Sequence, residues 1–349
     1  MAIMSSTPYW WQEAPPTSLP TTAIAAKCDV VIVGAGYTGL SAALTLARAG
    51  RQVQVFDRQR PGEGASTRNG GIASGNLRPN YRQMVRRFGA ARAAAIQAEA
   101  KAAREDLAQF IKREAIDCEF RLTGRFTGAA NPAEYETLAR EADVLRKTLK
   151  IDAYAVPRAE QKSVLGTDFY QGGMVRNDIG GLNPAKLHRG MLTAAQNAGA
   201  SVHGETAVHG FAPRHTGFLV ETARGPVEAD YVLLGTNGYT DHADPWLRRR
   251  LVPVRSRIIA TAPVSNNLMS ELMPKGVMCS KDPQTALLLP AFPGRHAHPV
   301  WRSGRHHCRR PILADRQPAP RARRPGMGAL GGAEGGVANS GRRARRFGP

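Results

Sequence analysis

Residues 29–57 read DVVIVGAGYTGLSAALTLARAGRQVQVFD, and this stretch decides the fold. Residues 29–33 form a short apolar, β-branched run, which is typical of a strand buried on both faces. Apolar residues then recur at helical spacing until Gly50, and residues 52–56 form a second strand-like run. The pattern therefore predicts a βαβ unit of about thirty residues.

Three glycines lie between the first predicted strand and the helix, in the motif Gly34-Ala35-Gly36-Tyr37-Thr38-Gly39. Gly34 permits a tight turn, Gly36 lets the backbone approach a pyrophosphate, and Gly39 lets helix and strand pack closely. The helix N-terminus then stabilises the anion. Asp57, at the end of the second strand, is placed to accept hydrogen bonds from a ribose 2′-hydroxyl. Such a motif can be a mere glycine-rich turn, but its strand, helix and acid context favours a dinucleotide site.

Residues 64–71 read GASTRNGG and lie just past the second predicted strand. A domain that binds NAD would usually proceed here to a helix and a third strand, so this segment favours FAD. Its small residues permit the backbone to lie against a flat ligand, and Ser66, Arg68 and Asn69 offer donors for phosphate or ring oxygens. A mobile surface loop is the alternative for this segment, and a NAD-dependent dehydrogenase is the alternative for the whole chain.

At these residues the chain resembles the D-amino-acid-oxidase-like superfamily of FAD-dependent oxidoreductases. Residues 34–41 and 68–71 are closest to its gamma-glutamylputrescine oxidase branch. The resemblance covers roughly residues 9–280. Further similar segments are residues 182–187, 205–208, 229–240 and 253–263.

The resemblance implies an α/β fold of mixed α+β character: a Rossmann-like FAD-binding domain interleaved with an antiparallel substrate-binding sheet, the arrangement called GR2. FAD-binding parts are expected at about residues 27–90 and 180–245, and substrate-domain parts at about 115–180 and 246–280. The resemblance also places Val208 beside the adenine. The residues expected to bind the cofactor are Gly34, Ala35, Gly36, Tyr37, Thr38, Gly39, Asp57, Arg58, Ser66, Arg68, Asn69, Gly70, Gly71 and Val208.

The implied reaction oxidises a carbon–nitrogen bond of a small amine or amino acid by hydride transfer to the flavin, with oxygen or another electron acceptor re-oxidising it. In such chemistry the cofactor does the difficult step, while protein groups orient the substrate and exclude water. No catalytic acid or base is therefore predicted. His188, His203 and His209 are expected to be surface or packing residues.

Several helices and strands are predicted outside the βαβ unit. Residues 90–114 are rich in Ala, Glu, Lys and Arg, which favours a helix. Asn131 and Asn183 each precede a proline and cap a predicted helix, the second of which stops at Gly199. Strands are expected at residues 207–211, 218–222 and 231–234, with a turn at residues 214–217.

Composition places the chain among globular proteins, with 42% hydrophobic residues. No stretch approaches the roughly 20 apolar residues of a membrane-spanning helix, and residues 1–20 lack the layout of a signal peptide. We therefore expect a cytoplasmic location and no membrane partner. The four cysteines form no CxxC pair, which indicates neither a metal site nor a disulfide framework. Residues 1–26, with the cluster Tyr9-Trp10-Trp11, are expected to form an arm draped on the domain.

Residues 281–349 differ from the rest of the chain in charge. They hold 14 Lys or Arg against 3 Asp or Glu, so over half of the formal net charge of +20 lies in one fifth of the chain. The charge therefore describes this tail better than the whole protein, and a nucleic-acid partner is not favoured. A tail of this composition does not easily bury a core, so a disordered, basic, low-complexity segment is expected.

A shift of reading frame near Ser280 is the leading explanation of this tail. The chain would then be a truncated flavin-binding protein with little or no activity, which is a second hypothesis for its function. A basic arm that binds nucleic acid or anionic surfaces through phosphate contacts stays open. The His and Cys cluster within residues 296–308 lacks the spacing of metal ligands.

Overall fold

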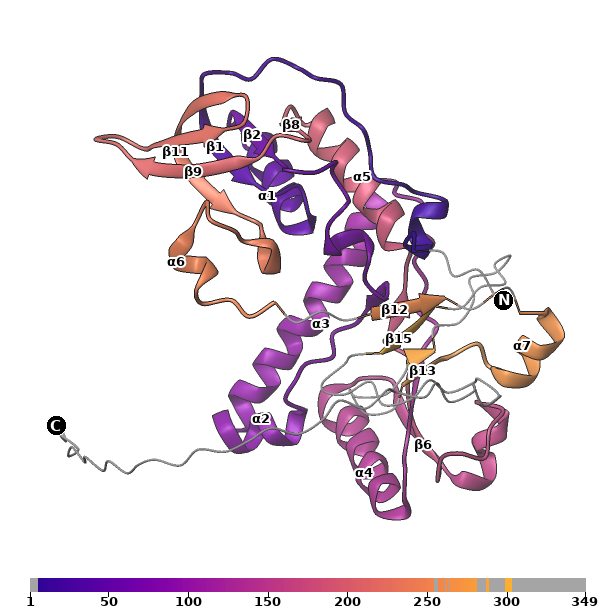
Figure 1. The fold of residues 1–349 in the computed structure, drawn as a ribbon. Helices are drawn as coiled ribbons and strands as arrows, with labels where there is room; N and C mark the ends of the chain where they lie inside the picture. The colour runs from indigo at the N-terminus through magenta and orange to yellow at the C-terminus, as the bar shows by residue number, and fades with distance from the viewer. Residues whose placement is uncertain are drawn as a thin grey trace, which may run out of the picture. The chain divides into compact units, whose positions relative to one another are not determined.

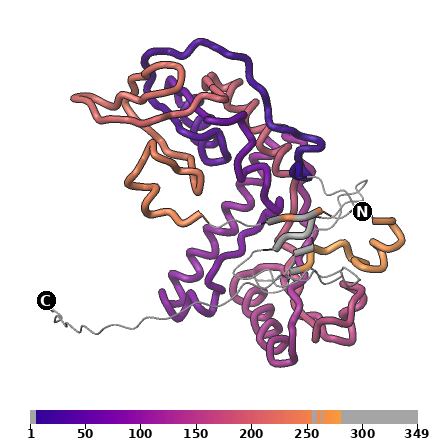
Figure 2. Tube along the Cα trace, in the orientation of Figure 1, coloured from indigo at the N-terminus to yellow at the C-terminus, as the bar shows by residue number. Residues whose placement is uncertain are grey.

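The computed structural model describes residues 6–253, 257–260, 262, 264–280, 287–288 and 299–302. The Cα trace in Figure 2 runs from the N-terminal arm through a first sheet and along the helix α3 (Ala90–Arg113) into a second sheet. It returns through α5 (Pro184–Asn197) to the first sheet before it enters the second sheet again. This alternation confirms the interleaved α/β fold expected from the sequence.

The first sheet has six strands in the order β8-β2-β1-β11-β10-β9 (Figure 1). The strands β8, β2, β1 and β11 are parallel, and β10 and β9 continue the sheet antiparallel. The predicted strand at residues 231–234 is the end of a longer strand that begins at Gly225. The bounds are β1 (Lys27–Val33), β2 (Val53–Phe56), β8 (Ser201–His203), β9 (Val208–Pro213), β10 (Phe218–Thr222) and β11 (Gly225–Leu234).

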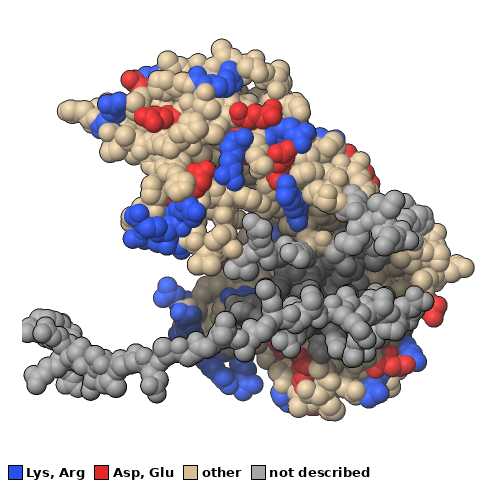
Figure 3. Space-filling model, viewed as in Figure 1, with Lys and Arg blue, Asp and Glu red and all other residues tan. Residues whose placement is uncertain are grey.

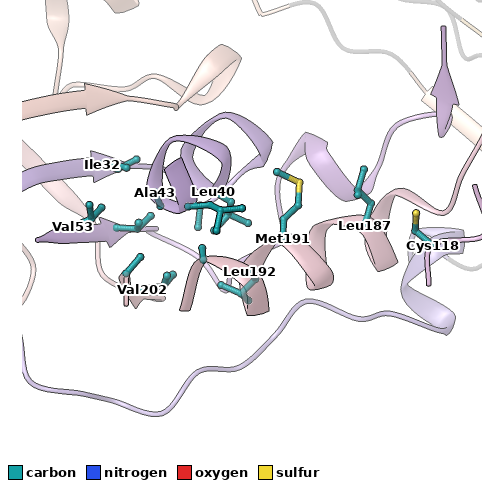
Figure 4. Close-up of a cluster of buried hydrophobic side chains, with 14 of the residues drawn as sticks. Ile32, Leu40, Ala43, Val53, Cys118, Leu187, Met191, Leu192 and Val202 are labelled. Carbon is teal, nitrogen blue, oxygen red and sulfur yellow. The ribbon is translucent and has the colours of Figure 1, made fainter. Parts of the chain in front are cut away.

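Both faces of β1 are buried, as the apolar run predicted. Val30 and Ile32 belong to one core cluster with α1 (Tyr37–Arg48) and α5, whereas Val31 and Val33 belong to a second cluster with Phe56. Successive side chains of a strand point to opposite faces, so one short strand serves two cores. Figure 4 shows the first cluster, with Ile32, Leu40, Ala43, Val53, Leu187, Met191 and Leu192 among its labelled side chains.

The second sheet has seven strands in the order β12-β15-β14-β13-β4-β6-β5. Neighbouring strands are antiparallel except β13 and β4, which are parallel. Two of its strands, β14 and β15, lie beyond Ser280, so the sheet extends past the boundary at which the tail was expected to begin. The bounds are β4 (Arg125–Gly128), β5 (Ala153–Val156), β6 (Gly173–Arg176), β12 (Arg257–Ala260), β13 (Met278–Ser280), β14 (Leu287–Leu288) and β15 (Pro299–Arg302).

The predicted helix caps are confirmed. The side chain of Asn131 accepts a hydrogen bond from the amide of Glu134 at the start of α4 (Pro132–Leu149), and Asn183 caps α5 through the amides of Ala185 and Lys186. Within the described residues, no helix is both long and apolar enough to cross a membrane. The face drawn in Figure 3 carries Lys and Arg as well as Asp and Glu side chains. The remaining helices are α2 (Tyr81–Phe88), α6 (Pro245–Arg248) and α7 (Asn266–Leu272), with short 3-10 helices η1 (Tyr9–Gln12), η2 (Ala65–Thr67), η3 (Arg158–Ser163) and η4 (Asn237–Tyr239).

The expected tail is described only at β14 and β15. The His and Cys cluster for which no metal site was expected lies outside the described residues, at His296, His298, His306, His307 and Cys308. Cys28, Cys118 and Cys279 are buried free thiols. Burial raises the pKa of Cys118 and of Cys279 to about 11, so both stay protonated at neutral pH. Burial also raises the pKa of Cys28, so all three of these thiols stay protonated at neutral pH.

Candidate functional site

A cavity of about 300 Å³ lies where the parallel strands of the first sheet end. Val33, Phe56 and Leu234, the last residues of β1, β2 and β11, line it. The carboxyl edge of a parallel sheet is where open α/β folds bind their ligands. The lining also includes residues of the 34–39 motif, of the 64–69 loop and of residues 235–244.

The glycines of the 34–39 motif are required by close contacts. A Cβ atom on Gly39 would lie 1.9 Å from the carbonyl oxygen of Gly34, which is impossible without moving the backbone. Gly34 has a φ of +100°, a conformation that favours glycine, and its added Cβ would lie 3.1 Å from the carbonyl oxygen of Gly235. The predicted tight turn and close packing of helix on strand are therefore present.

The start of α1 is open toward the cavity. Gly36, its N-cap, makes no side-chain capping bond, and the amide of Tyr37 donates to the Ser66 hydroxyl over 3.0 Å. Gly36 and Thr38 also line the cavity. A helix N-terminus reached through bare backbone is suited to an anion such as a pyrophosphate.

Asp57 stabilises the glycine turn at residues 34–39 through a hydrogen bond of its carboxylate. One carboxylate oxygen accepts the amide of Ala35 over 2.9 Å, and the other accepts the amide of Gln59 over 2.9 Å. Each carboxylate oxygen has a second acceptor position, so this group can still receive a ribose hydroxyl. Asp57 lies in the cavity wall, as its position after β2 suggested.

His188 holds the same turn from α5. It is 2% exposed, and its Nε2 lies 2.7 Å from the carbonyl oxygen of Ala35. Burial lowers the pKa of His188, so the ring is neutral at neutral pH and donates one N–H to this oxygen. The hydroxyl of Tyr37 donates to the carbonyl oxygen of Pro184, a second link to α5 over 2.8 Å. His188 is thus a packing residue rather than a surface one; His203 is also buried, and His209 is exposed.

The loop at residues 62–71 approaches the cavity with its polar residues. Asn69 organises it: its Oδ1 accepts the amide of Gly71 and its Nδ2 donates to the carbonyl oxygen of Ser66, each over 2.8 Å. Gly71 has a φ of +66°, and a Cβ there would lie 2.2 Å from the carbonyl oxygen of Leu182. The loop is therefore an ordered structure with its own hydrogen bonds, which disfavours the alternative of a mobile surface loop.

The cavity brings together nine of the fourteen residues expected to bind a cofactor. Arg68, whose guanidinium carbon lies 4.7 Å from the ring centroid of Trp11, is outside the lining. The nine lining residues are Gly34, Gly36, Tyr37, Thr38, Asp57, Arg58, Ser66, Asn69 and Val208. Ala35, Gly39, Gly70 and Gly71 are outside the lining as well.

Residues 235–244 form a wall that was not among the expected site residues. The hydroxyls of Thr236 and Thr240 lie 2.7 Å apart and tie this segment into a compact turn. Arg58 reaches across to it, with an ion pair to Asp241 over 3.1 Å and its guanidinium carbon 5.9 Å from the ring centroid of Tyr239. The similarity of residues 229–240 to the flavoenzyme family was the signal that could have added this wall.

These residues fit FAD. Bare glycine backbone and an open helix N-terminus suit its pyrophosphate, and the Asp57 carboxylate suits its ribose. The buried side chains of Val33, Phe56 and Val208 give the cavity an apolar floor for a flat ring.

Comparison with known proteins agrees with this chemistry. The family described as "FAD dependent oxidoreductase" matches residues 29–305. The chain belongs to this family. Its cofactor is FAD, so the alternative of a NAD-dependent dehydrogenase is wrong. The match extends beyond Ser280, in agreement with the two strands found there.

Two curated relatives of the family are similar over most of this chain. The gamma-glutamylputrescine oxidoreductase of Escherichia coli K12 is 33% identical over 73% of this chain and 59% of its own length. A probable oxidoreductase, OrdL, of Rhizobium meliloti is 31% identical over 77% of this chain and 63% of its own length. The chain thus spans about three fifths of the length of these relatives.

The fold is shared with solved structures of amino-acid oxidising enzymes. Glycine oxidase from Geobacillus kaustophilus superposes with a TM-score of 0.65 at 19% identity, over 83% of this chain and 75% of that enzyme. L-proline dehydrogenase from P. horikoshii gives a TM-score of 0.60 at 17% identity, over 80% and 70% of the two chains. At these identities the likeness shows the fold.

Proposed function

We propose that this chain binds FAD in the cavity beside residues 34–39 and oxidises the carbon–nitrogen bond of a small amine or amino acid. The observation that supports it most is the cavity itself, in which the glycine turn, Asp57 and the 64–69 loop converge. Membership of the FAD-dependent oxidoreductase family gives the class of reaction. When bound, FAD would supply the acceptor for the hydride that leaves the carbon beside the amine nitrogen.

The residues of the chain then bind and orient. The helix N-terminus at Gly36 and Thr38 would hold the pyrophosphate, Asp57 would accept a ribose hydroxyl, and Val208 would pack on the adenine. His188 keeps the turn in place by its hydrogen bond to Ala35 and carries no charge at neutral pH. No acid or base of the chain is assigned to the reaction, because amine oxidation depends on orientation and exclusion of water.

The substrate that we propose first is gamma-glutamylputrescine or a similar monosubstituted diamine. The support is the E. coli relative, at 33% identity, and the sequence motif at residues 68–71 that resembles the same branch. Oxygen is the proposed electron acceptor.

The experiment is to purify the full chain, record its absorption spectrum with and without added FAD, and measure oxygen uptake. The panel contains gamma-glutamylputrescine, putrescine, glycine, sarcosine and D-alanine, each also assayed with an artificial electron acceptor in place of oxygen. We expect flavin bands and turnover of gamma-glutamylputrescine above the other substrates. Protein that stays colourless with excess FAD would contradict the proposal.

Bound flavin without turnover on any substrate or acceptor would instead support the second hypothesis, a flavin-binding protein with little or no activity. Turnover of glycine or sarcosine alone would retain the reaction class and reject the proposed substrate.

A further inference from the structure

We propose that residues 9–14, called the brace below, hold the loop at residues 62–71 in the conformation that receives the flavin, and that Trp10 and Trp11 are positioning residues for the cofactor. The inference rests on the proposed binding of FAD. It concerns a part of the chain outside the cavity, which neither the glycine motif nor the family resemblance assigned to the site.

Trp11 holds the loop at Thr67 and, through Thr67, at Gly62. Its indole Nε1 donates to the Thr67 hydroxyl over 2.8 Å, and this hydroxyl donates in turn to the carbonyl oxygen of Gly62. Thr67 is 2% exposed, so these bonds form away from water. The chain of two hydrogen bonds crosses the loop and joins its first glycine to the brace.

Trp10 holds the loop at Asn69. Its indole Nε1 donates to the carbonyl oxygen of Asn69 over 2.9 Å, and the side chain is 3% exposed. Asn69 is the residue whose side chain bonds the amide of Gly71 and the carbonyl oxygen of Ser66. Because Ser66 and Asn69 both line the cavity, Trp10 sets the position of two cavity residues without touching the cavity itself.

The stacking of Arg68 on Trp11 is a third contact between the brace and the loop. Three consecutive loop residues, 67–69, are thus each held by one of two consecutive tryptophans. The interaction accounts for the position of Arg68 outside the cavity lining, where the sequence had suggested a donor to phosphate or ring oxygens.

The brace is itself fastened to α5. Glu13 forms an ion pair with Lys186 over 3.3 Å, and its carbonyl oxygen accepts a hydrogen bond from Arg189. Trp10 and Ala14 pack against Ala185 in a small apolar cluster. The same helix holds the glycine turn through His188 and Pro184. The brace therefore sets the loop relative to the helix that also positions the pyrophosphate turn.

A loop of this composition needs such support. Four of its ten residues are glycines, at positions 62, 64, 70 and 71, and glycine gives up the most conformational freedom when it is ordered. If FAD had to order the loop, the free energy of ordering would weaken its binding. A loop that is already held in place binds FAD without this cost.

The test compares Trp10→Phe and Trp11→Phe with Trp246→Phe in the full chain loaded with FAD. Phenylalanine keeps an aromatic ring but lacks the indole N–H. Trp246 is the matched control because it is exposed, stacks on Arg250 and is not among the residues that line the cavity. The measurement is the rate of FAD release after dilution, followed by flavin fluorescence at a temperature where circular dichroism shows each variant folded.

We expect Trp10→Phe and Trp11→Phe each to release FAD roughly threefold to tenfold faster than the wild type, the range of one buried hydrogen bond. Thr67→Val, which lacks both the acceptor of Trp11 and the donor to Gly62, should release FAD at least as fast, and adding Trp11→Phe to it should change nothing further. Thr67→Ser keeps the hydroxyl and should retain the wild-type rate. If the tryptophan variants do not fold, the rates of FAD release in Thr67→Val and Thr67→Ser are compared with each other, and equal rates would contradict the proposal.

Binding should also protect the brace, since coupling between two sites is reciprocal. We expect FAD to slow cleavage of the N-terminal arm by protease several-fold in the wild type and less in Thr67→Val. Wild-type chain that binds no FAD would overturn the proposed function. Wild-type chain that binds FAD, with all variants releasing it at the same rate, would leave the function intact and overturn the brace.

Discussion

The turn at residues 34–39 and the second sheet are built by opposite means. In the turn, backbone approaches backbone so closely that a Cβ on Gly39 would lie 1.9 Å from a carbonyl oxygen. In the second sheet, large side chains fill the space, and Phe126 of β4 is fully buried with Val175 of β6. The turn is thus defined by residues that lack side chains, and the sheet by residues that have them. Mutations in the two regions should therefore separate cofactor affinity from stability.

The largest effect is expected for Phe126→Ala in the second sheet. Removing a fully buried aromatic side chain leaves a cavity, and such changes cost about 3–5 kcal/mol in free energy of unfolding. Urea denaturation measures this loss. Because Phe126 lies outside the cofactor cavity, the folded variant should bind FAD within about twofold of the wild type.

The matched control for that variant is Phe169→Ala, since Phe169 is 66% exposed. Its free energy of unfolding should change by less than about 1 kcal/mol. A similar loss in both variants would mean that burial does not govern stability in this sheet.

The next effect is expected for Gly39→Ala in the turn. One methyl group must displace the Gly34 carbonyl, and overpacking of this kind costs about 1–3 kcal/mol in stability. The displaced turn should also weaken FAD binding by more than tenfold, as measured by titration of apoprotein followed by flavin fluorescence. In Gly210→Ala, where an added Cβ meets no atom within 4 Å, both quantities should stay at the wild-type value.

The same contrast explains what the sequence could predict. The glycine turn and Asp57 were predicted from their spacing in the sequence, because backbone contact with a ligand demands particular residues at particular spacings. The strands β4, β5 and β6 have four residues each, and β4 pairs with β13 about 150 positions away. Such pairing is decided by long-range packing, which leaves no local pattern to read.

Two parts of the site were hidden for the same reason. The cluster Tyr9-Trp10-Trp11 stood out as apolar, yet nothing in the sequence relates Trp10 to Asn69, which is 59 positions away. Arg58 was among the residues expected to bind the cofactor, but its partner Asp241 is one of many acids in the chain. Arg68 looked like a ligand-binding donor because a sequence cannot show that Trp11 lies beneath it.

A smaller effect is expected for the pH dependence of the turn through His188. Burial lowers the pKa of this ring below its ordinary value of 6.5, so below pH 6.5 the unfolded chain binds a proton that the folded chain does not. The free energy of unfolding contributed by His188 is therefore fully present above pH 6.5 and is lost as the pH falls toward the lowered pKa.

Denaturation between pH 7 and pH 5 measures this slope. His188→Gln keeps a donor for the Ala35 carbonyl but cannot titrate, so the slope should become shallower, while stability at pH 7 should fall by no more than about 1.5 kcal/mol. Some slope should remain, because burial lowers the pKa of His203 as well. The exposed His209 gives the control, and His209→Gln with the same shallower slope would contradict the assignment to His188.

The smallest effect is expected where the turn meets residues 235–244, at the ion pair between Arg58 and Asp241. Both side chains are nearly half exposed, and pairs of this kind contribute at most about 1 kcal/mol and are screened by salt. Asp241→Asn should therefore speed FAD release by less than about fivefold at low ionic strength, and the difference should vanish at 1 M salt. Asp168→Asn, which removes a more exposed ion pair with Lys162 outside the cavity, should have no effect at either ionic strength.

This pair tests whether an exposed ion pair adds to the binding supplied by the glycine turn, Asp57 and the 64–69 loop. Both residues line the cavity, and their ion pair joins the residues after β2 to those after β11, two strands that are not neighbours in the sheet. If Asp241→Asn releases FAD at the wild-type rate even at low salt, the glycine turn and the loop are sufficient to retain the cofactor. If instead the salt-dependent difference is found, the charges of Arg58 and Asp241 add to the binding supplied by the glycine turn, Asp57 and the loop.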